Sequence, residues 1–204
     1  MIRDDVSNKL VHLIKGDTEE EAYNTLLEII KTGKLLGGTG FIKGGYNCVC
    51  FSEAPISKLG QILALTNELK EDARIKYQPF GVMVDKKWLF EQGGRPVIYQ
   101  ADDEFENLPE DIRYRHVRYE PQNGIDWTWE REWRIKTDEL ILSPDNTTLI
   151  VPNRSYIKRI KKKHFNSLRK KVVKSGRKSI EKIIKQFRQY KWHFIVLEDL
   201  GVEL

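Results

Sequence analysis

Residues 9–15 read Lys-Leu-Val-His-Leu-Ile-Lys, an apolar run with one histidine, His12, near its centre. A short run of this kind, rich in branched apolar side chains, is typical of a β-strand. The Asp-Thr pair at 17–18 can cap a helix, and the glutamates at 19–21 favour its first turn. The chain therefore opens with a strand and then a helix, which we expect Gly33 to end.

Outward from this opening, predicted strands and helices are interleaved along the chain. Strands are expected at 48–52, 80–84, 96–99, 127–135, 147–151 and 192–197, and helices at 56–69, at 86–90 and within 154–191. A surface loop or short helix is expected at 102–111. No internal repeat or low-complexity linker divides the sequence, so we expect one α+β domain over residues 1–204.

Composition and cysteine usage indicate a cytoplasmic protein. A chain of 204 residues can bury most of its apolar surface without disulfides or structural metals. Its two cysteines, Cys48 and Cys50, would lie on one face of a strand, which makes them a poor disulfide pair. They also lack the further ligands that zinc requires. No secretory leader and no apolar run of membrane-spanning length is expected.

Charge is distributed very unevenly along the chain. Residues 154–191 contain sixteen Lys or Arg and one acid, Glu181, whereas the other residues contain 19 cations and 29 acids. The basic segment therefore has a net charge of +15 and the remainder a net charge of −10, against +5 for the whole chain. The apolar residues of the segment recur at helical spacing, so we expect basic helices.

Common cofactor motifs do not account for the sequence. Four scattered histidines form no metal-ligand pattern, and the glycine-rich stretch at 37–40 is not followed by the Lys-Ser/Thr pair of a P-loop. Three segments remain whose side chains could take part in catalysis or ligand binding. They are the strand that carries His12, the Phe-Ser-Glu sequence at 51–53, and Trp-Glu-Arg-Glu-Trp-Arg at 129–134.

In this order the three segments resemble those of ADP-ribosyltransferases, in particular DarT-like DNA-modifying toxins and AbiGi-type abortive-infection proteins. The resemblance extends over residues 10–151 and includes Gly-Lys-Leu-Leu at 33–36, Val-Cys-Phe-Ser-Glu-Ala-Pro at 49–55 and Gly-Gly-Arg-Pro-Val-Ile-Tyr at 93–99. It implies a split β-sheet or β-sandwich core with flanking helices. It also implies NAD as a substrate, and no metal.

The resemblance assigns the chemistry to two glutamates. Cleavage of the nicotinamide–ribose bond creates an oxocarbenium-like centre, which a carboxylate can stabilise while it holds a ribose hydroxyl. Glu132 is expected to be that catalytic group, and Glu130 to contact the acceptor. In a continuous strand the two side chains would share a face. The alternative is that both are surface charges paired with Arg131 and Arg134.

The resemblance also implies contacts to NAD. His12 would bind the adenosine ribose, Phe51 would stack beside nicotinamide, and Ser52 would brace the catalytic glutamate. Tyr46 and Tyr99 are further stacking candidates. DarT-like proteins have an arginine directly after the middle strand, where this chain has Glu53, so Arg95 or Arg74 would have to replace it. The alternative is ordinary strand packing for all of these side chains.

The basic segment is expected to attract nucleic acid, because clustered cations bind phosphates by releasing counterions. The expected contacts are Lys161, Lys162, Lys163, Arg169, Lys170, Lys171, Arg177 and Lys178. A solvated helix face, docking on the acidic remainder of the chain, or an acidic partner such as an antitoxin would also fit.

These features together predict an NAD-dependent ADP-ribosyltransferase of a phage-defence or toxin–antitoxin type that modifies DNA or RNA. Two rival functions stay open. One is a non-catalytic AbiGi-like protein that binds nucleic acid or a partner. The other is an NAD glycohydrolase, which would use the same site with water as the acceptor.

Overall fold

The computed structural model describes residues 7–40, 42–55, 58, 63, 77–173 and 190–202, and the side chains of these residues except 171–173. The helix expected at 56–69 lies outside the described residues, apart from positions 58 and 63. The second half of the basic segment, 174–189, also lies outside them.

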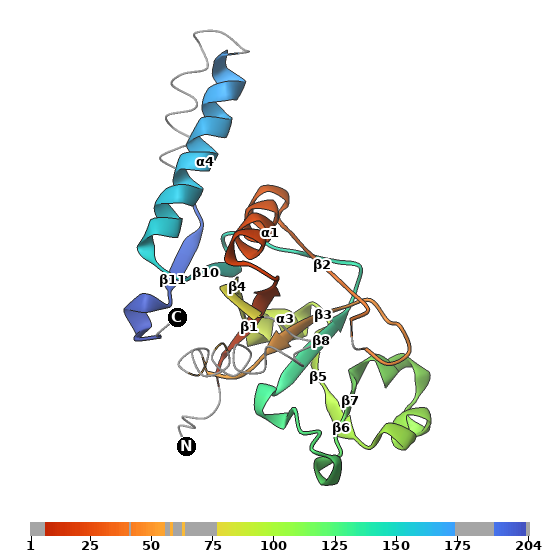
Figure 1. Cartoon of the computed structure of the whole chain (residues 1–204). Helices are drawn as coiled ribbons and strands as arrows, with labels where there is room; N and C mark the ends of the chain where they lie inside the picture. The colour runs from red at the N-terminus through yellow and green to blue at the C-terminus, as the bar shows by residue number, and fades with distance from the viewer. Residues whose placement is uncertain are drawn as a thin grey trace.

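The described residues form an α+β protein around a seven-stranded mixed sheet (Figure 1). The strand order is β11-β10-β4-β1-β3-β8-β5, and all neighbours are antiparallel except β10 and β11. The strands are β1 (Lys9–Lys15), β3 (Cys48–Ser52), β4 (Tyr77–Asp85), β5 (Arg95–Pro96), β8 (Glu132–Lys136), β10 (Thr147–Val151) and β11 (His193–Val196). Segments that are remote in sequence, such as β1 and β8, are thereby separated by β3 alone.

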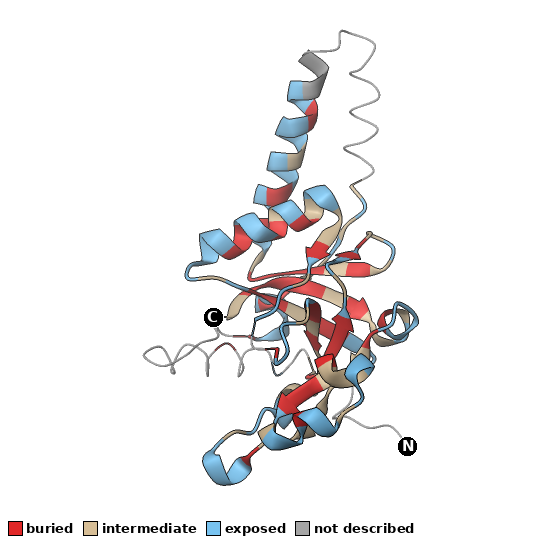
Figure 2. Ribbon diagram, turned by 90° about the vertical axis from the view of Figure 1, so that its right-hand side faces the viewer, coloured by how far each residue is buried: buried red, intermediate tan, exposed pale blue. Residues whose placement is uncertain are grey.

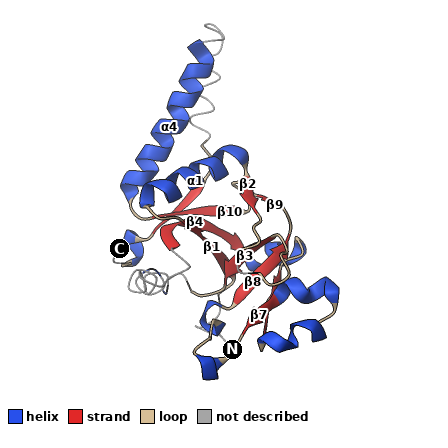
Figure 3. Ribbon diagram, turned by 45° about the vertical axis from the view of Figure 1, so that its right-hand side comes forward, coloured by secondary structure: helices blue, strands red, loops and turns tan. Residues whose placement is uncertain are grey.

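Two smaller strand pairs lie beside this sheet (Figure 3). In one, β2 (Lys34–Leu36) pairs with β9 (Glu139–Ile141) in antiparallel fashion. In the other, β6 (Ile98–Gln100) pairs with β7 (His116–Arg118) in parallel. The single strand expected at 96–99 is therefore divided between β5 and β6, which belong to different sheets.

Helix α1 (Glu19–Thr32) begins and ends as the sequence predicted. The hydroxyl of Thr18 accepts a hydrogen bond from the Glu21 N–H at 3.2 Å. Gly33 closes the helix in the left-handed conformation, with φ of 67°, and donates its N–H to the Ile29 carbonyl. These are local preferences of a hydroxyl and of a residue without a side chain, so they are readable from sequence.

Two hydrophobic layers cover the sheet. Leu10 and Ile14 of β1 point to the side on which α1 and α4 (Arg154–Val173) pack, which we call the helix face. Val11 and Leu13 point to the other side, which we call the second face. Burial is concentrated on the strands, whereas α4 is exposed along most of its described length and extends beyond the sheet (Figure 2).

The remaining described helices are short. Helix α3 (Lys86–Glu91) confirms the helix expected at 86–90. The acidic stretch forms two 3-10 helices, η2 (Asp102–Asn107) and η3 (Glu110–Arg115). Three further 3-10 turns are η4 (Pro121–Asn123), η5 (Thr128–Glu130) and η6 (Glu198–Leu200).

The prediction of a strand at 127–135 is wrong for residues 127–131. Asp126 accepts hydrogen bonds from the N–H and the hydroxyl of Thr128, which favours a turn rather than an extended chain. Residues Thr128–Glu130 therefore form η5, Arg131 adopts a left-handed conformation with φ of 45°, and the strand begins only at Glu132.

Candidate active site

The end of β3 holds the two predicted glutamates in place. Ser52 is the register partner of Glu132. Its hydroxyl donates a 2.7 Å hydrogen bond to the main-chain carbonyl of Glu130, which also accepts the Glu53 N–H at 3.1 Å. Ser52 thus braces the turn that carries the first glutamate, by a contact to main chain rather than to a carboxylate.

Glu132 is held in place by Arg134, two residues further along β8. The guanidinium Nε and Nη2 lie 2.8 and 3.2 Å from the two carboxylate oxygens, and the side-chain exposures are 14% for Glu132 and 6% for Arg134. Nη1 of Arg134 donates to the carbonyls of Tyr114 and His116, both at 2.9 Å. This bidentate contact fixes the orientation of the carboxylate.

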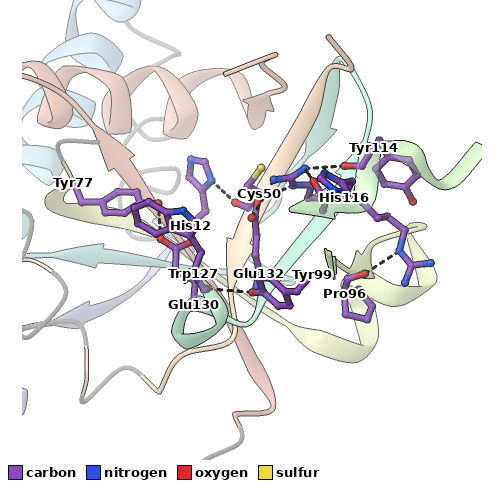
Figure 4. A network of polar contacts seen from close by, with 12 residues as sticks. His12, Cys50, Tyr77, Pro96, Tyr99, Tyr114, His116, Trp127, Glu130 and Glu132 are labelled. Carbon is purple, nitrogen blue, oxygen red and sulfur yellow. Dashed lines mark hydrogen bonds and ion pairs between the residues drawn. The ribbon is translucent and has the colours of Figure 1, made fainter. Parts of the chain in front are cut away.

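Glu130 has a very different environment. Burial and, after it, the negative charge of Glu132 raise its pKa to about 7, against the smaller lowering effects of Lys15, the Tyr77 hydroxyl and Arg134. The Tyr77 hydroxyl lies 3.5 Å from Glu130 Oε1. Burial likewise raises the pKa of Tyr77, so its phenol stays protonated. Figure 4 shows Tyr77 and Glu130 on one side of this network, and Glu132 and Cys50 at its centre.

The two carboxyl groups therefore differ: Glu132 is bound by a guanidinium, whereas Glu130 gains or loses a proton near neutral pH. Such a difference is what general acid–base chemistry beside a charged transition state requires. The alternation of side chains along a strand, which was expected from sequence, does not explain why Glu130 is near Glu132, because Glu130 lies on a turn. The tertiary contacts of Ser52, Glu53 and Tyr77 place Glu130 near Glu132 instead.

Thiol chemistry does not fit this cluster. Both cysteines are free. Burial raises the pKa of Cys48 to about 11, and burial together with the charge of Glu132 raises the pKa of Cys50 as well. A thiol must ionise to act as a nucleophile, so both side chains are inert near neutral pH.

The structure does not bring His12 together with Glu132. Val11 is the register partner of Ser52 and shares the second face with it and with Glu132. Because side chains alternate along β1, His12 points to the helix face, on the other side of the sheet. The expectation that His12 and Glu132 line one cleft is therefore corrected by the register of β1 and β3.

His12 instead has a structural contact. Its Nδ1 lies 2.7 Å from the Cys50 carbonyl oxygen, and its ring lies edge-on to Phe51 with centroids 5.8 Å apart. A carbonyl oxygen can only accept, so Nδ1 carries the proton. Burial lowers the pKa of His12 and keeps the ring neutral. Gly81 of β4 lies against the His12 carbonyl, where a Cβ would collide.

Of the aromatic candidates for NAD contacts, the structure brings only Tyr99 to the glutamates. Its hydroxyl accepts the Glu132 N–H at 3.1 Å and lies 3.3 Å from the Trp127 carbonyl (Figure 4). Phe51 is 2% exposed in the helix-face core, so a stacking role for it is corrected by its burial. Tyr46 packs near Cys48 and Cys50, with the Lys136 ammonium 4.7 Å from its ring centroid.

Arg95 does not reach the glutamates. Its guanidinium stacks 3.8 Å from the centroid of Phe90 and donates to the carbonyls of Phe90 and Gly94. Arg74 lies outside the described residues. Glu53, which stands where DarT-like proteins have an arginine, accepts hydrogen bonds from Lys86 at 2.6 Å and from the Trp133 indole at 2.7 Å.

Sequence reasoning missed two members of this site, namely Lys15 and Tyr77. Arg134 was expected only as an ion-pair partner in the alternative interpretation of the glutamates, and it does pair with Glu132, although in a buried setting. Tyr77 lies 53 residues before Glu130 and gave no comparable signal. Lys15 ends β1, and its ammonium lies 5.6 Å from the centroid of the Tyr77 ring.

The predicted nucleic-acid contacts lie elsewhere in the molecule. Lys161, Lys162, Arg169 and Lys170 are exposed on α4. Lys163 is also exposed, with its ammonium 4.8 Å from the centroid of the Tyr23 ring of α1. Lys171 lies in α4 but its side chain is outside the described set, as are Arg177 and Lys178 altogether.

Two searches within the described residues found no site of another class. No group of three or more His, Cys, Asp or Glu side chains is arranged to hold a metal ion. None of the helices in the described ranges has the length and apolar character needed to cross a membrane. Comparisons of the chain with protein-family models, with curated proteins and with solved structures found no match.

Proposed function

We propose that the protein is an NAD-dependent ADP-ribosyltransferase whose reacting centre is the Glu130–Glu132 pair and whose acceptor is a nucleic acid. The observation that carries the chemistry is the different setting of the two carboxyl groups. Glu132 is held by Arg134 in a bidentate contact, while Glu130 is buried and its pKa is raised to about 7. NAD as the donor is inferred from the motif resemblance over residues 10–151.

In this proposal Glu132 acts on the ribose. The bond between C1′ and the nicotinamide nitrogen breaks, its electron pair leaves with nicotinamide, and positive charge develops on the ribose. A carboxylate has about four acceptor positions, of which Arg134 occupies two, so the others can accept a ribose hydroxyl. Because Arg134 holds the carboxylate in a fixed orientation, no reorganisation is needed as the charge develops.

Glu130 acts on the acceptor. A nucleophilic oxygen or nitrogen forms the new bond to C1′ and passes its proton to the Glu130 carboxylate. This step requires ionised Glu130, so the transfer rate should rise with pH and level off above about 7. The adenosine half of NAD must be held by groups other than His12, because that side chain points to the opposite face.

The proposal is tested by measuring nicotinamide release and label transfer from radiolabelled NAD, with DNA, RNA, protein or no acceptor present. Glu132→Gln keeps the volume and removes the charge, so release should fall about 10²–10³-fold. Glu130→Gln should abolish label transfer at every pH, because the proton acceptor is missing. Glu91→Gln, on an exposed position of α3, serves as the matched control.

Each outcome separates the candidate functions. Release that is equally fast with and without acceptor, that gives no label transfer and that is lost in Glu132→Gln would identify an NAD glycohydrolase. Equal release by wild type and Glu132→Gln would contradict the catalytic assignment. No release from any mixture, together with no increase in melting temperature at saturating NAD, would overturn the proposal and favour the non-catalytic protein, because any ligand of the folded state must stabilise it.

A further inference from the structure

The described part of α4 is a basic helix attached to the body of the protein at its base. The Tyr156 hydroxyl donates to Glu19 at 2.9 Å, and the Arg159 guanidinium donates to Glu20 at 2.8 Å. Tyr156 and Ile160 enter the helix-face core. From this base α4 extends beyond the sheet (Figures 1 and 3). Its orientation is therefore fixed by contacts to α1 and the sheet.

Three of its exposed cations share one stripe. With 100° per residue, Lys158, Lys162 and Arg169 differ by no more than about 40° around the helix axis, and they span roughly 16 Å along it. They lie opposite the buried side of the helix, formed by Tyr156 and Ile160. The stripe is thus a straight, outward-facing row of positive charge.

Like Lys161 and Lys170, and unlike Arg154 and Arg159, the three stripe residues have no ion-pair partner within the described part of the chain. Arg154 pairs with Asp199 at 2.9 Å, and Arg159 pairs with Glu20. No carboxylate within the described ranges lies at ion-pair distance from Lys158, Lys162 or Arg169. Helix α4 itself contains no acid.

We infer that the Lys158–Lys162–Arg169 stripe binds the phosphodiester backbone of a nucleic acid at a surface separate from the candidate active site. Lysine is depleted in the cores of protein–protein interfaces, which are rich in aromatic and apolar side chains. The described surface of α4 exposes a single large apolar side chain, Phe165. A lysine-rich, acid-free row suits regularly spaced phosphates better than a protein partner.

The separation from the active site follows from the sheet. Helix α4 packs on the helix face and follows β10, whereas Glu132 lies on the second face of β8. From β10 to β8 there are four inter-strand spacings, about 19 Å in all. The stripe therefore anchors a nucleic acid without contacting the reacting atoms. That the anchored molecule is also the acceptor rests on the proposed function, whereas the binding itself does not.

Binding is tested by fluorescence anisotropy with labelled single-stranded DNA, duplex DNA and single-stranded RNA of equal length, over a range of salt concentrations and without NAD. The test variant is Lys158→Gln/Lys162→Gln/Arg169→Gln. Its matched control is Lys31→Gln/Lys34→Gln/Lys87→Gln, which removes the same charge from surface lysines outside α4. Glutamine is a good helix former, so α4 should be retained, which circular dichroism checks.

The stripe variant should bind on the order of a hundredfold more weakly at 0.1 M salt. The slope of the logarithm of its binding constant against the logarithm of the salt concentration should be shallower by about two to three. The control should bind within a fewfold of wild type. Equal losses in both variants would overturn the inference, because total charge alone would then explain binding. Wild-type protein that binds none of the three probes would overturn it as well, and an acidic protein partner would become the remaining explanation.

Nicotinamide release from NAD without nucleic acid, measured on the same variants, keeps the two proposals distinguishable. The stripe variant should retain wild-type release while losing nucleic-acid binding. Wild-type protein that binds nucleic acid but releases no nicotinamide would count against the proposed function only. Intact binding by the stripe variant, with release also intact, would count against this inference only.

Discussion

The β3–β8 end of the sheet and helix α4 both concentrate charged side chains, but they surround them differently. At β3–β8 the charges are buried and contact one another, as in the Glu132–Arg134 pair. Along α4 the cations of the stripe are solvated. Burial changes the proton affinity of a group and fixes the orientation of its side chain, whereas a solvated charge acts at a distance through its electric field. The first region is therefore suited to chemistry and the second to binding.

The largest effect should come from Arg134→Met. Arg134 donates to Glu132 and to two main-chain carbonyls, so its loss leaves a buried carboxylate unpaired. We expect a loss of about 3–5 kcal/mol in the free energy of unfolding, measured by urea denaturation. Arg154→Met removes an equally charged group that is 74% exposed and paired with Asp199, and should cost about 0–1 kcal/mol. Similar losses in the two variants would erase the contrast between the regions.

The second effect concerns Glu130. Its pKa is about 7 when folded, against 4.5 as the ordinary value. An acid whose pKa is raised by folding destabilises the folded state as pH rises from 4.5 to 7, because the unfolded chain ionises first. Glu130→Gln should therefore raise the free energy of unfolding by about 2–3 kcal/mol at pH 8 and leave it nearly unchanged at pH 4.

Urea denaturation at several pH values checks this prediction, with Glu91→Gln as the control. A gain that is equal at all pH values would contradict it, because the difference must follow the titration of Glu130. The same variant also tests the contrast between the two regions, because replacing an exposed carboxylate should not give a pH-dependent gain of this size in the free energy of unfolding.

The third effect concerns His12. His12→Phe keeps the ring and removes the donor to the Cys50 carbonyl, so we expect a loss of about 1–3 kcal/mol in stability. In wild type, the lowered pKa of His12 means that stability falls as pH drops below about 6.5, where the unfolded chain gains a proton that the buried ring does not. His12→Phe should lose that part of the acid sensitivity.

Measuring NAD affinity distinguishes a structural role of His12 from direct contact between His12 and NAD. If His12 acts only through the sheet, His12→Phe should change NAD affinity, measured by calorimetry, by no more than a fewfold. A loss of a hundredfold or more at unchanged stability would contradict the placement of His12 away from the active site.

The smallest effect on stability should come from the α4 stripe. Replacing Lys158, Lys162 and Arg169 by glutamine should change the free energy of unfolding by less than about 0.5 kcal/mol per site, as is usual for exposed positions. Thermal denaturation measures this directly. A larger loss would mean that the stripe contacts another part of the chain and is not a free binding surface.

Local chemistry explains which parts of the fold were predictable from sequence. The Thr18 and Gly33 helix ends, the strands at 48–52 and 147–151, and helix α3 each follow from side chains within a few residues. The turn before Glu132 was missed because aromatic residues favour strands, while Asp126 formed a competing hydrogen-bonded turn. The direction of His12 was missed because it depends on the register between β1 and β3, which is a long-range property.

The same distinction applies to the candidate site. Glu130, Glu132 and Ser52 were predicted from motif order, and they do lie close together. Tyr77 was not predictable, since its position depends on the irregular pairing of β1 with β4 near Lys15. The proton affinity of Glu130 was not predictable either, because it is set by burial and by groups from three strands, β1, β4 and β8.

The left-handed conformation of Arg131 has a consequence for how such a site can change over evolution. It separates two carboxyl groups that are neighbours in sequence into two mechanical units, one carried by a turn and one by the sheet. Substitutions within residues 126–131 can reshape the turn that carries Glu130, while the Glu132–Arg134 contact on β8 stays in place. In the proposed transferase, acceptor preference and bond cleavage would then be altered separately.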